Sequence, residues 1–266
     1  MSGAYNFLNS LAMRKHSQNF SPLTAAATLP LNPIPAAMKL RQKVRPLLFR
    51  LLYPLHMYFN RDSRQTRVDG LSLRVEPQVF DPGRHFSSKI LARYLLRLDL
   101  AERQLLDMGT GSGIIGITAA QKGASVIAVD INPAAAQLAA ANAQALQVAD
   151  KMHVLCGDLF APLKDVLPFD WIVFNPPFFP RPSTRAVQAA YHAGENYATI
   201  TRFLQEAKSF LAPAGRILLI LSSDMNLFEL QAMFDRQNYR VAHCEIKPHL
   251  FEQFYLVQLR SLETDH

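Results

Sequence analysis

The stretch LLDMGTGSGIIG, residues 105 to 116, runs from an apolar segment through a glycine-rich turn into a second apolar segment. The first segment predicts a buried strand over 104–108, and the second predicts a helix over 113–122. Glycines between them let backbone N–H groups approach a ligand closely. In an open parallel sheet, ligands bind in the crevice at the carboxyl ends of the strands. The stretch therefore predicts a ligand-binding turn after the first strand of an α/β sheet.

Apolar runs on both sides of this turn alternate in a way that predicts the rest of the fold. The expected strands lie over 104–108, 125–130, 152–156, 170–174 and 215–221. The expected helices lie over 86–98, 113–122, 133–146, 197–211 and 225–237. Near-continuous apolar strands are typical of a parallel sheet covered on both faces. The segments YRVAHCEI and FEQFYLVQL follow one another without a helix, which predicts a C-terminal antiparallel hairpin. We expect an α/β fold with a doubly wound, mostly parallel, seven-stranded Rossmann-like sheet.

Charge is distributed unevenly along the chain. Residues 1–60 carry no Asp or Glu, and their basic residues are Arg14, Lys15, Lys39, Arg41, Lys43, Arg45 and Arg50. The remaining residues, 61–266, contain 21 basic and 21 acidic side chains. We divide the chain into a basic N-terminal arm with short helices, 1–65, and a main domain, 66–266. The arm could bind RNA, rest on an anionic membrane surface, cover the active site, or pack its leucines on the main domain.

Composition and cysteine usage exclude several classes of protein. The sequence has no run of about 18 uncharged apolar residues, so we expect no integral membrane span. The two cysteines, Cys156 and Cys244, lie far apart in strand-like segments. This spacing fits neither a disulfide framework nor a zinc site, and we expect no metal and a cytoplasmic location.

The identity of the ligand at the glycine turn stays open at this point. Residues 111–116 also satisfy G-x-G-x-x-G, a dinucleotide fingerprint. Asp130 ends the next predicted strand, 23 residues after Asp107. An acid at this place can hold the ribose hydroxyls of NAD or of another nucleoside ligand.

The segment FDWIVFNPPFF, residues 169–179, distinguishes between these ligands. It ends the fourth predicted strand, so its polar end overlooks the same crevice as 109–113. The two prolines fix two φ angles and remove two backbone donors. The amide oxygen of Asn175 and the carbonyl of Pro176 then form a rigid acceptor pair for a planar NH2 group, with Phe178 placed to stack on it. Such acceptors would direct the nitrogen lone pair at an electrophile. The structural alternative is an Asn-Pro turn that simply ends a strand.

In this order, the motifs resemble those of class I S-adenosylmethionine (SAM) methyltransferases, of the branch that methylates nitrogen. LLDMGTGSG resembles the first motif, AVDINP the second, GDLF the third and NPPF the fourth. Within that branch, VFDP, NPPFF and YHAGENYATITRFLQEAKSFLAPAGRILLI look most like the HemK-type methyltransferases of glutamine in release factors and their small methyltransferase-domain relatives. The same motifs occur in adenine and guanine base methyltransferases of RNA and DNA.

The resemblance implies SAM as cofactor and a role for each motif residue. The residues implied to bind the cofactor are Asp107, Gly109, Gly111, Gly113, Asp130, Ile131, Asp158, Leu159 and Asn175. The residues implied to hold the target nitrogen are Asn175, Pro176 and Phe178. In this scheme Asp107 lies near the ammonium group of SAM, Asp130 binds the ribose hydroxyls and Asp158 binds the adenine amine. No metal or separate general base is required.

We therefore expect a SAM-dependent N-methyltransferase acting on a planar amide or exocyclic amine, with a protein glutamine favoured as acceptor. An RNA or DNA base is the second candidate acceptor. Phe178 stands where HemK-type enzymes usually carry Tyr, and Arg84 and His85 stand where relatives commonly carry acidic residues. Two alternatives stay open, a SAM-using enzyme of small-molecule biosynthesis and a non-catalytic SAM-binding scaffold. The sequence leaves the oligomeric state undetermined.

Overall fold

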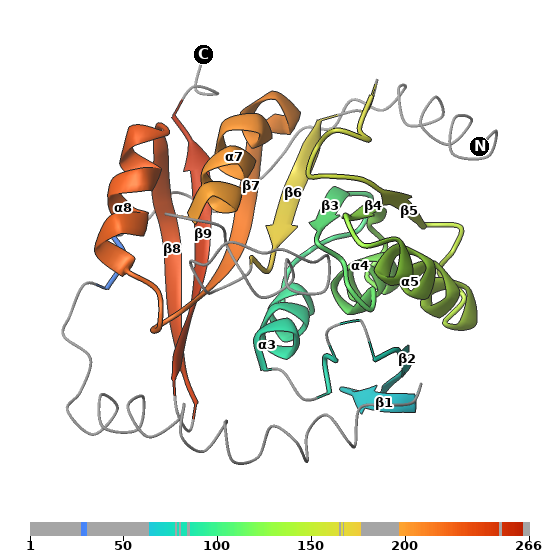
Figure 1. Ribbon diagram of the computed structural model, residues 1–266. Helices are drawn as coiled ribbons and strands as arrows, with labels where there is room; N and C mark the ends of the chain where they lie inside the picture. The colour runs from blue at the N-terminus through green and yellow to red at the C-terminus, as the bar shows by residue number, and fades with distance from the viewer. Residues whose placement is uncertain are drawn as a thin grey trace.

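The structure is a computed structural model of the whole chain (Figure 1). It describes residues 28–30, 64–77, 79, 81–83, 86–164, 166, 168–176, 197–249 and 252–262. Most of the predicted arm lies outside this part of the chain, so the division into 1–65 and 66–266 stays a prediction. Within 28–30, Leu29 is buried in the core, and its backbone N–H donates to the side-chain oxygen of Gln231 at 2.9 Å.

The core is a seven-stranded sheet in the order β5-β4-β3-β6-β7-β9-β8. The strands are β3 (Gln104–Met108), β4 (Ser125–Asp130), β5 (Met152–Cys156), β6 (Phe169–Phe174), β7 (Leu211–Ser222), β8 (Tyr239–Pro248) and β9 (Gln253–Ser261). The five strands from β5 to β7 pair in parallel, whereas β9 pairs antiparallel with both β7 and β8. The predicted doubly wound sheet and its C-terminal antiparallel hairpin are therefore confirmed.

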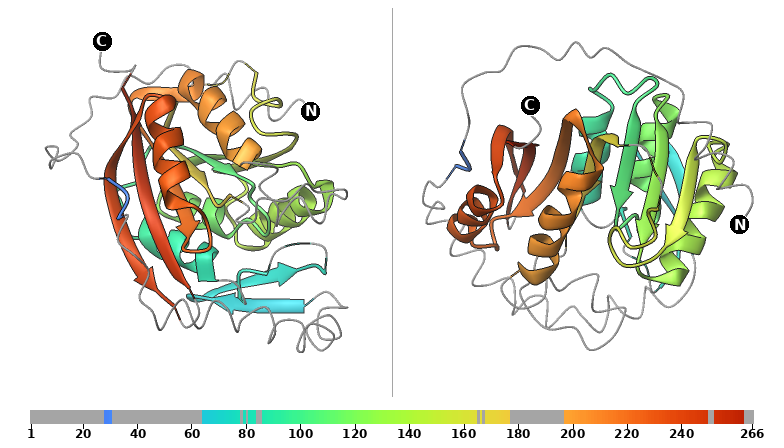
Figure 2. Two further views of the ribbon diagram at one scale, coloured as in Figure 1. Left: turned by 60° about the vertical axis from the view of Figure 1, so that its left-hand side comes forward. Right: turned by 90° about the horizontal axis from the view of Figure 1, so that it is seen from above.

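Helices cover both faces of the sheet, as Figure 2 shows. They are α3 (Phe86–Leu95), α4 (Ile114–Gln121), α5 (Pro133–Ala145), α7 (Ala198–Ala207), the short 3-10 helix η3 (Lys208–Phe210) and α8 (Leu227–Arg236). The buried apolar residues of α3 and α4, with Ala139 and Ala143 of α5, share one hydrophobic cluster, and those of α7 and α8 share another. Alternate residues of β6 join the two clusters, with Trp171 and Val173 in the first and Ile172 and Phe174 in the second. This alternation explains why the strand is apolar at nearly every position.

The segment NRDSRQTRVDG, residues 60–70, contains a strand that the sequence analysis does not predict. β1 (Arg64–Val68) and β2 (Leu71–Val75) form a two-stranded antiparallel sheet. The turn between them is Asp69-Gly70, with φ values of 49° and 89°. Positive φ at both central residues is what the Asp-Gly pair favours in a tight hairpin. The hairpin packs Val68 and Leu73 into the cluster that contains α3, α4 and α5.

Candidate active site

The strand order brings the two main sequence motifs to one edge of the sheet. β3 lies between β4 and β6, and the chain leaves β3 toward β4 before it returns to form β6. The crevice of an α/β sheet opens at such a switch point, outside the carboxyl ends of the strands. Met108 and Phe174, the last residues of β3 and β6, are opposite one another. The glycine turn and Asn175 therefore start side by side, as the sequence predicted.

The glycine turn has a backbone that only glycine adopts readily. Gly109, Gly111 and Gly113 have φ values of 68°, 57° and 87°. A Cβ added to Gly113 would lie 3.2 Å from Ala139, so this glycine lets α4 and α5 approach closely. A Cβ added to Gly111 would meet no atom within 4 Å. The turn thus leaves open space beside Gly111, where a ligand can approach the backbone.

Asp107 is a fully buried carboxylate with one oxygen unused. Its Oδ2 accepts hydrogen bonds from Thr110 Oγ1 at 2.7 Å and from the Gly116 N–H at 2.9 Å. Its Oδ1 accepts no hydrogen bond from the described residues. Burial raises the pKa of Asp107 from 3.8 to about 6, and the hydrogen bonds from Thr110 and Gly116 oppose the rise. A buried oxygen of this kind is satisfied when a positively charged donor reaches it.

Asp130 ties the glycine turn to the loop after β4. Its Oδ2 accepts from the Gly111 N–H at 2.8 Å, and its Oδ1 accepts from the Asn132 N–H at 2.9 Å. Burial raises the pKa of Asp130, although these two hydrogen bonds lower it. Each oxygen keeps lone-pair capacity for a further donor. The next residue, Ile131, is 54% exposed and offers an apolar surface at the same edge.

Asp158 follows β5 and is held by a residue that sequence reasoning missed. Its carboxylate forms an ion pair of 2.7 Å with Arg202 on α7, and Arg202 also reaches Glu206 at 3.1 Å. The hydrogen bond that Arg202 donates to Asp158 raises the pKa of Arg202. Leu159 is buried in the cluster that contains α7 and α8. No local pattern pointed to Arg202, because the contact depends on how α7 lies against the loop after β5.

Asn175 follows β6 directly, and its amide group contacts two serines of α3. Its Nδ2 donates to Ser87 Oγ at 3.1 Å and to Ser88 Oγ at 3.2 Å. Pro176 is buried beside it. Phe178, the aromatic residue of the motif, lies outside the described residues, so its predicted stacking role remains a prediction. Sequence reasoning placed a helix over 86–98 without connecting its first turn to Asn175.

Asn142 on α5 connects the glycine turn to the β1–β2 hairpin. It is 3% exposed, and its Oδ1 accepts from the Arg74 N–H at 2.9 Å. Its Nδ2 donates to the Arg74 carbonyl at 3.0 Å and to the Ser112 carbonyl at 2.8 Å. One side chain therefore satisfies three backbone groups from two segments.

Asn142→Ala is expected to lower the free energy of unfolding by roughly 2–4 kcal/mol, because it leaves three buried or partly buried backbone groups without their partner. It should also weaken ligand binding at the glycine turn, since the Ser112 carbonyl loses its anchor. Denaturant unfolding and calorimetry measure the two effects. The control is Asn226→Ala at the N-cap of α8, which should lower stability by about 1 kcal/mol without changing ligand affinity. Equal behaviour of the two variants would contradict the role given to Asn142.

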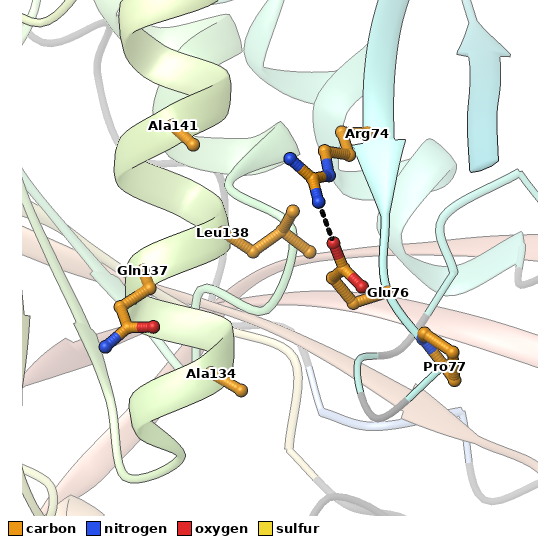
Figure 3. Close-up of a pocket in the computed structure, with 7 residues that line it drawn as sticks. All are labelled: Arg74, Glu76, Pro77, Ala134, Gln137, Leu138 and Ala141. Atoms are coloured by element: carbon orange, nitrogen blue, oxygen red, sulfur yellow. Dashed lines mark ion pairs between the residues drawn. The ribbon is translucent and has the colours of Figure 1, made fainter. Parts of the chain in front are cut away.

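A cavity of about 380 Å³ lies between β2 and α5 (Figure 3). Its lining residues are Arg74, Glu76, Pro77, Ala134, Gln137, Leu138 and Ala141. Arg74 and Glu76 form an ion pair of 2.8 Å on one wall. None of the motif residues lines this cavity.

The described part of the chain contains no group of three or more His, Cys, Asp or Glu side chains placed to hold a metal ion. None of the helices described in the structure is long and apolar enough to cross a membrane.

Comparison with known proteins gives a family match and several relatives. A family model described as methyltransferase small domain matches residues 71–245. A putative protein N5-glutamine methyltransferase of Methanocaldococcus jannaschii is 32% identical over 162 residues, which cover 59% of this chain and 78% of that protein. A release factor glutamine methyltransferase of Moorella thermoacetica is 35% identical over 166 residues, covering 58% of each chain.

A third relative is named for a different acceptor. It is a tRNA1(Val) (adenine(37)-N6)-methyltransferase of Porphyromonas gingivalis, 30% identical over 176 residues that cover 60% of this chain and 66% of that protein. Among solved structures, a 16S rRNA N2 G1207 methyltransferase of T. thermophilus, in complex with AdoMet and guanosine, superposes with a TM-score of 0.56 at 22% identity. That match covers 74% of this chain and 50% of the other. At this identity the likeness concerns the fold alone.

Proposed function

The chain belongs to the methyltransferase small domain family, and we propose on this basis that it transfers a methyl group from SAM to a planar amide or exocyclic amine nitrogen. The observation that carries the proposal is the position of Asn175 directly beside the glycine turn, where β6 pairs with β3. A nitrogen held by Asn175 would face a ligand held by the turn. Such placement supplies orientation, which is a large part of catalysis by positioning.

The residues at the turn fit the cofactor. When bound, SAM supplies an electrophilic methyl group on a sulfonium centre. The unused Oδ1 of Asp107 suits the ammonium group of SAM, because opposite charges interact strongly in a buried place. Asp130 keeps acceptor capacity for ribose hydroxyls, and exposed Ile131 offers an apolar surface beside it. Asp158 can accept from the adenine amine once Arg202 shares or releases its carboxylate.

Asn175 and Pro176 would hold the target nitrogen. The Asn175 oxygen and the Pro176 carbonyl accept its two hydrogens, and the backbone of Pro176 cannot bend away because its ring fixes φ. These two hydrogen bonds turn the nitrogen lone pair toward the methyl group and stabilise the positive charge that develops on the nitrogen during transfer. The nitrogen can lose its proton to water afterwards, since methylation makes it strongly acidic.

We favour a glutamine side-chain amide of a protein as acceptor. Two of the relatives are named for glutamine. The family match over 71–245 spans both the glycine turn and the NPPF motif. A nucleic-acid base is the second candidate, favoured by relatives named for tRNA adenine and by the basic segment 1–60. A cytoplasmic location belongs to the same proposal.

Incubation of the protein with cell extract and methyl-labelled SAM tests the proposal. We expect label in protein that resists ribonuclease, together with an equal amount of S-adenosylhomocysteine. Label that ribonuclease removes would identify RNA as the acceptor. Methylthioadenosine as the nucleoside product would indicate transfer of the aminobutyl chain, and binding without any product would indicate a scaffold. Either of the last two results would overturn the proposal.

A further inference from the structure

The face of α3 that packs on the sheet is apolar along most of the helix and polar at its N-terminal end. Leu91, Ala92 and Leu95 are buried against the sheet, as an amphipathic helix requires. One turn earlier, the same face carries Ser87 and Ser88, which are 2% and 6% exposed. Buried polar side chains need hydrogen-bond partners. These two hydroxyls therefore require a polar partner at the end of the sheet they cover.

That partner is the amide nitrogen of Asn175. Ser87 Oγ and Ser88 Oγ lie 3.1 Å and 3.2 Å from Nδ2, so each hydroxyl can accept one of its two hydrogens. A single hydroxyl would hold only one of them. Because the nitrogen and oxygen of a carboxamide diverge from the same carbon, a nitrogen held against α3 turns the oxygen away from α3. Among the described residues, none donates to that oxygen.

The backbone and the side chain of Asn175 are fixed by different groups. β6 pairs with β3 and β7 up to Phe174, and Pro176 fixes φ on the other side. The terminal rotation of an asparagine side chain is nevertheless broad and roughly two-fold, so a free amide can exchange its nitrogen and oxygen. An exchanged amide would present a donor to the NH2 group of an acceptor. Rotation of this one bond thus decides whether Asn175 can accept a hydrogen bond from the target NH2 group.

We propose that Ser87 and Ser88 are positioning residues that lock the rotation of the Asn175 amide and keep its oxygen directed at the acceptor nitrogen. The inference rests on the proposed function, because that function requires the Asn175 oxygen to accept a hydrogen bond from the target nitrogen. The inference also applies to the protein without substrate, because the hydrogen bonds from Asn175 to the two serines are present in the chain itself. The two serines act through Asn175 and do not touch the cofactor.

The test compares four proteins: wild type, the double variant Ser87→Ala/Ser88→Ala, the conservative variant Ser88→Thr, and a control. The control, Ser261→Ala, removes a buried serine hydroxyl at the C-terminal end of β9, which lies at the opposite edge of the sheet because β9 is antiparallel to β7. The measurements are kcat for label transfer into extract, Kd for SAM by calorimetry, Tm, and hydrogen exchange of the Asn175 side-chain NH2 by NMR. Loss of the signal in Asn175→Asp identifies that NH2 pair.

We expect the double variant to lose about tenfold to hundredfold in kcat, with Kd for SAM unchanged within about twofold. Its Asn175 NH2 hydrogens should exchange with water about tenfold faster or more, since their two acceptors are gone. Ser88→Thr keeps the hydroxyl and should retain wild-type exchange and most of kcat. Ser261→Ala should lower Tm without changing kcat or the exchange of Asn175.

Three results would overturn the inference: wild-type kcat in the double variant, unchanged NH2 exchange, or a parallel loss of kcat and SAM affinity, which would indicate a merely structural role. If the double variant fails to fold, the single variants Ser87→Ala and Ser88→Ala replace it with the same criteria. If the wild type transfers no label to any acceptor, the proposed function fails. The NH2 exchange still decides whether the serines hold the amide.

Discussion

Replacing Asn175 by Ala should reduce methyl transfer by about 10²–10³-fold while the affinity for SAM stays within a few-fold of wild type. The expected loss corresponds to removing one preorganised polar group from a catalytic site. Asn175 lies at the end of β6, across from the turn that carries the groups suited to the cofactor, so its removal affects the acceptor side of the crevice. Single-turnover transfer of labelled methyl groups into extract measures the rate, and calorimetry measures SAM binding.

The control for this prediction is Asn238→Ala. Asn238 lies in the turn before β8 with φ of 53°, a conformation that alanine adopts less readily than asparagine. We expect the control to lower stability by about 1 kcal/mol and to leave the transfer rate unchanged. A rate loss of similar size in both variants, or full activity of Asn175→Ala, would refute the role proposed for Asn175.

Asp107→Asn is expected to change protein stability and SAM binding in opposite directions at pH 8. The carboxylate of Asp107 is fully buried, and burial raises its pKa from 3.8 to about 6. The folded protein therefore holds this proton more tightly than the unfolded chain does. Consequently, the contribution of Asp107 to stability falls as the pH rises from about 4 to about 6, by up to roughly 3 kcal/mol, and remains lower above that range. An asparagine side chain has no such dependence.

Denaturant unfolding of the ligand-free protein between pH 4 and pH 8 measures this difference. We expect Asp107→Asn to gain stability relative to wild type as the pH rises through the lower part of the range, and to keep that gain at pH 8. The amide oxygen introduced by the substitution can still accept from Thr110 and Gly116, as Oδ2 of Asp107 does. An unfolding free energy whose pH dependence is the same in both proteins would contradict the raised pKa.

The same substitution should weaken SAM binding about 100-fold at pH 8, because it removes the negative charge that we assign to the ammonium group. In the wild type, affinity should increase as the pH rises through about 6, since the charged carboxylate is the form that binds the cation. The variant should show no such increase. Tight binding of SAM by Asp107→Asn would place the ammonium group elsewhere.

The central part of the fold was predictable because its signals are local. The run at 105–116 predicted β3, the turn and α4 within one or two residues, and the alternation of apolar strands with helices predicted a mostly parallel sheet. The rule that strand ends share one edge then brought Asn175 to the glycine turn without knowledge of any contact. The β1–β2 hairpin was missed although Asp69-Gly70 is a strong turn signal, because β1 alternates in a sequence, RQTRV, that is mostly polar.

The contacts that hold the site together could not be predicted in this way. Asn175 meets Ser87 across 88 residues of sequence, and Asn142 meets Arg74 across 68. Asp158 meets Arg202 through the placement of α7. Each of these pairs depends on how a helix is rotated and shifted on the sheet, which hydrophobic periodicity specifies only to the level of a face. Single buried polar residues on an apolar face, such as Ser87 and Ser88, were the available hint.

The strand order also places the residues proposed for the methyl donor and those proposed for the acceptor after different strands. Groups suited to the methyl donor follow β3, β4 and β5, whereas those suited to the acceptor follow β6 and begin α3. In the proposed function, the boundary between β3 and β6 therefore divides the half that binds the methyl donor from the half that binds the acceptor. Under that proposal, substitutions after β6 would change which nitrogen is selected while donor binding stays intact, so one scaffold could take new acceptors without a change to its cofactor site.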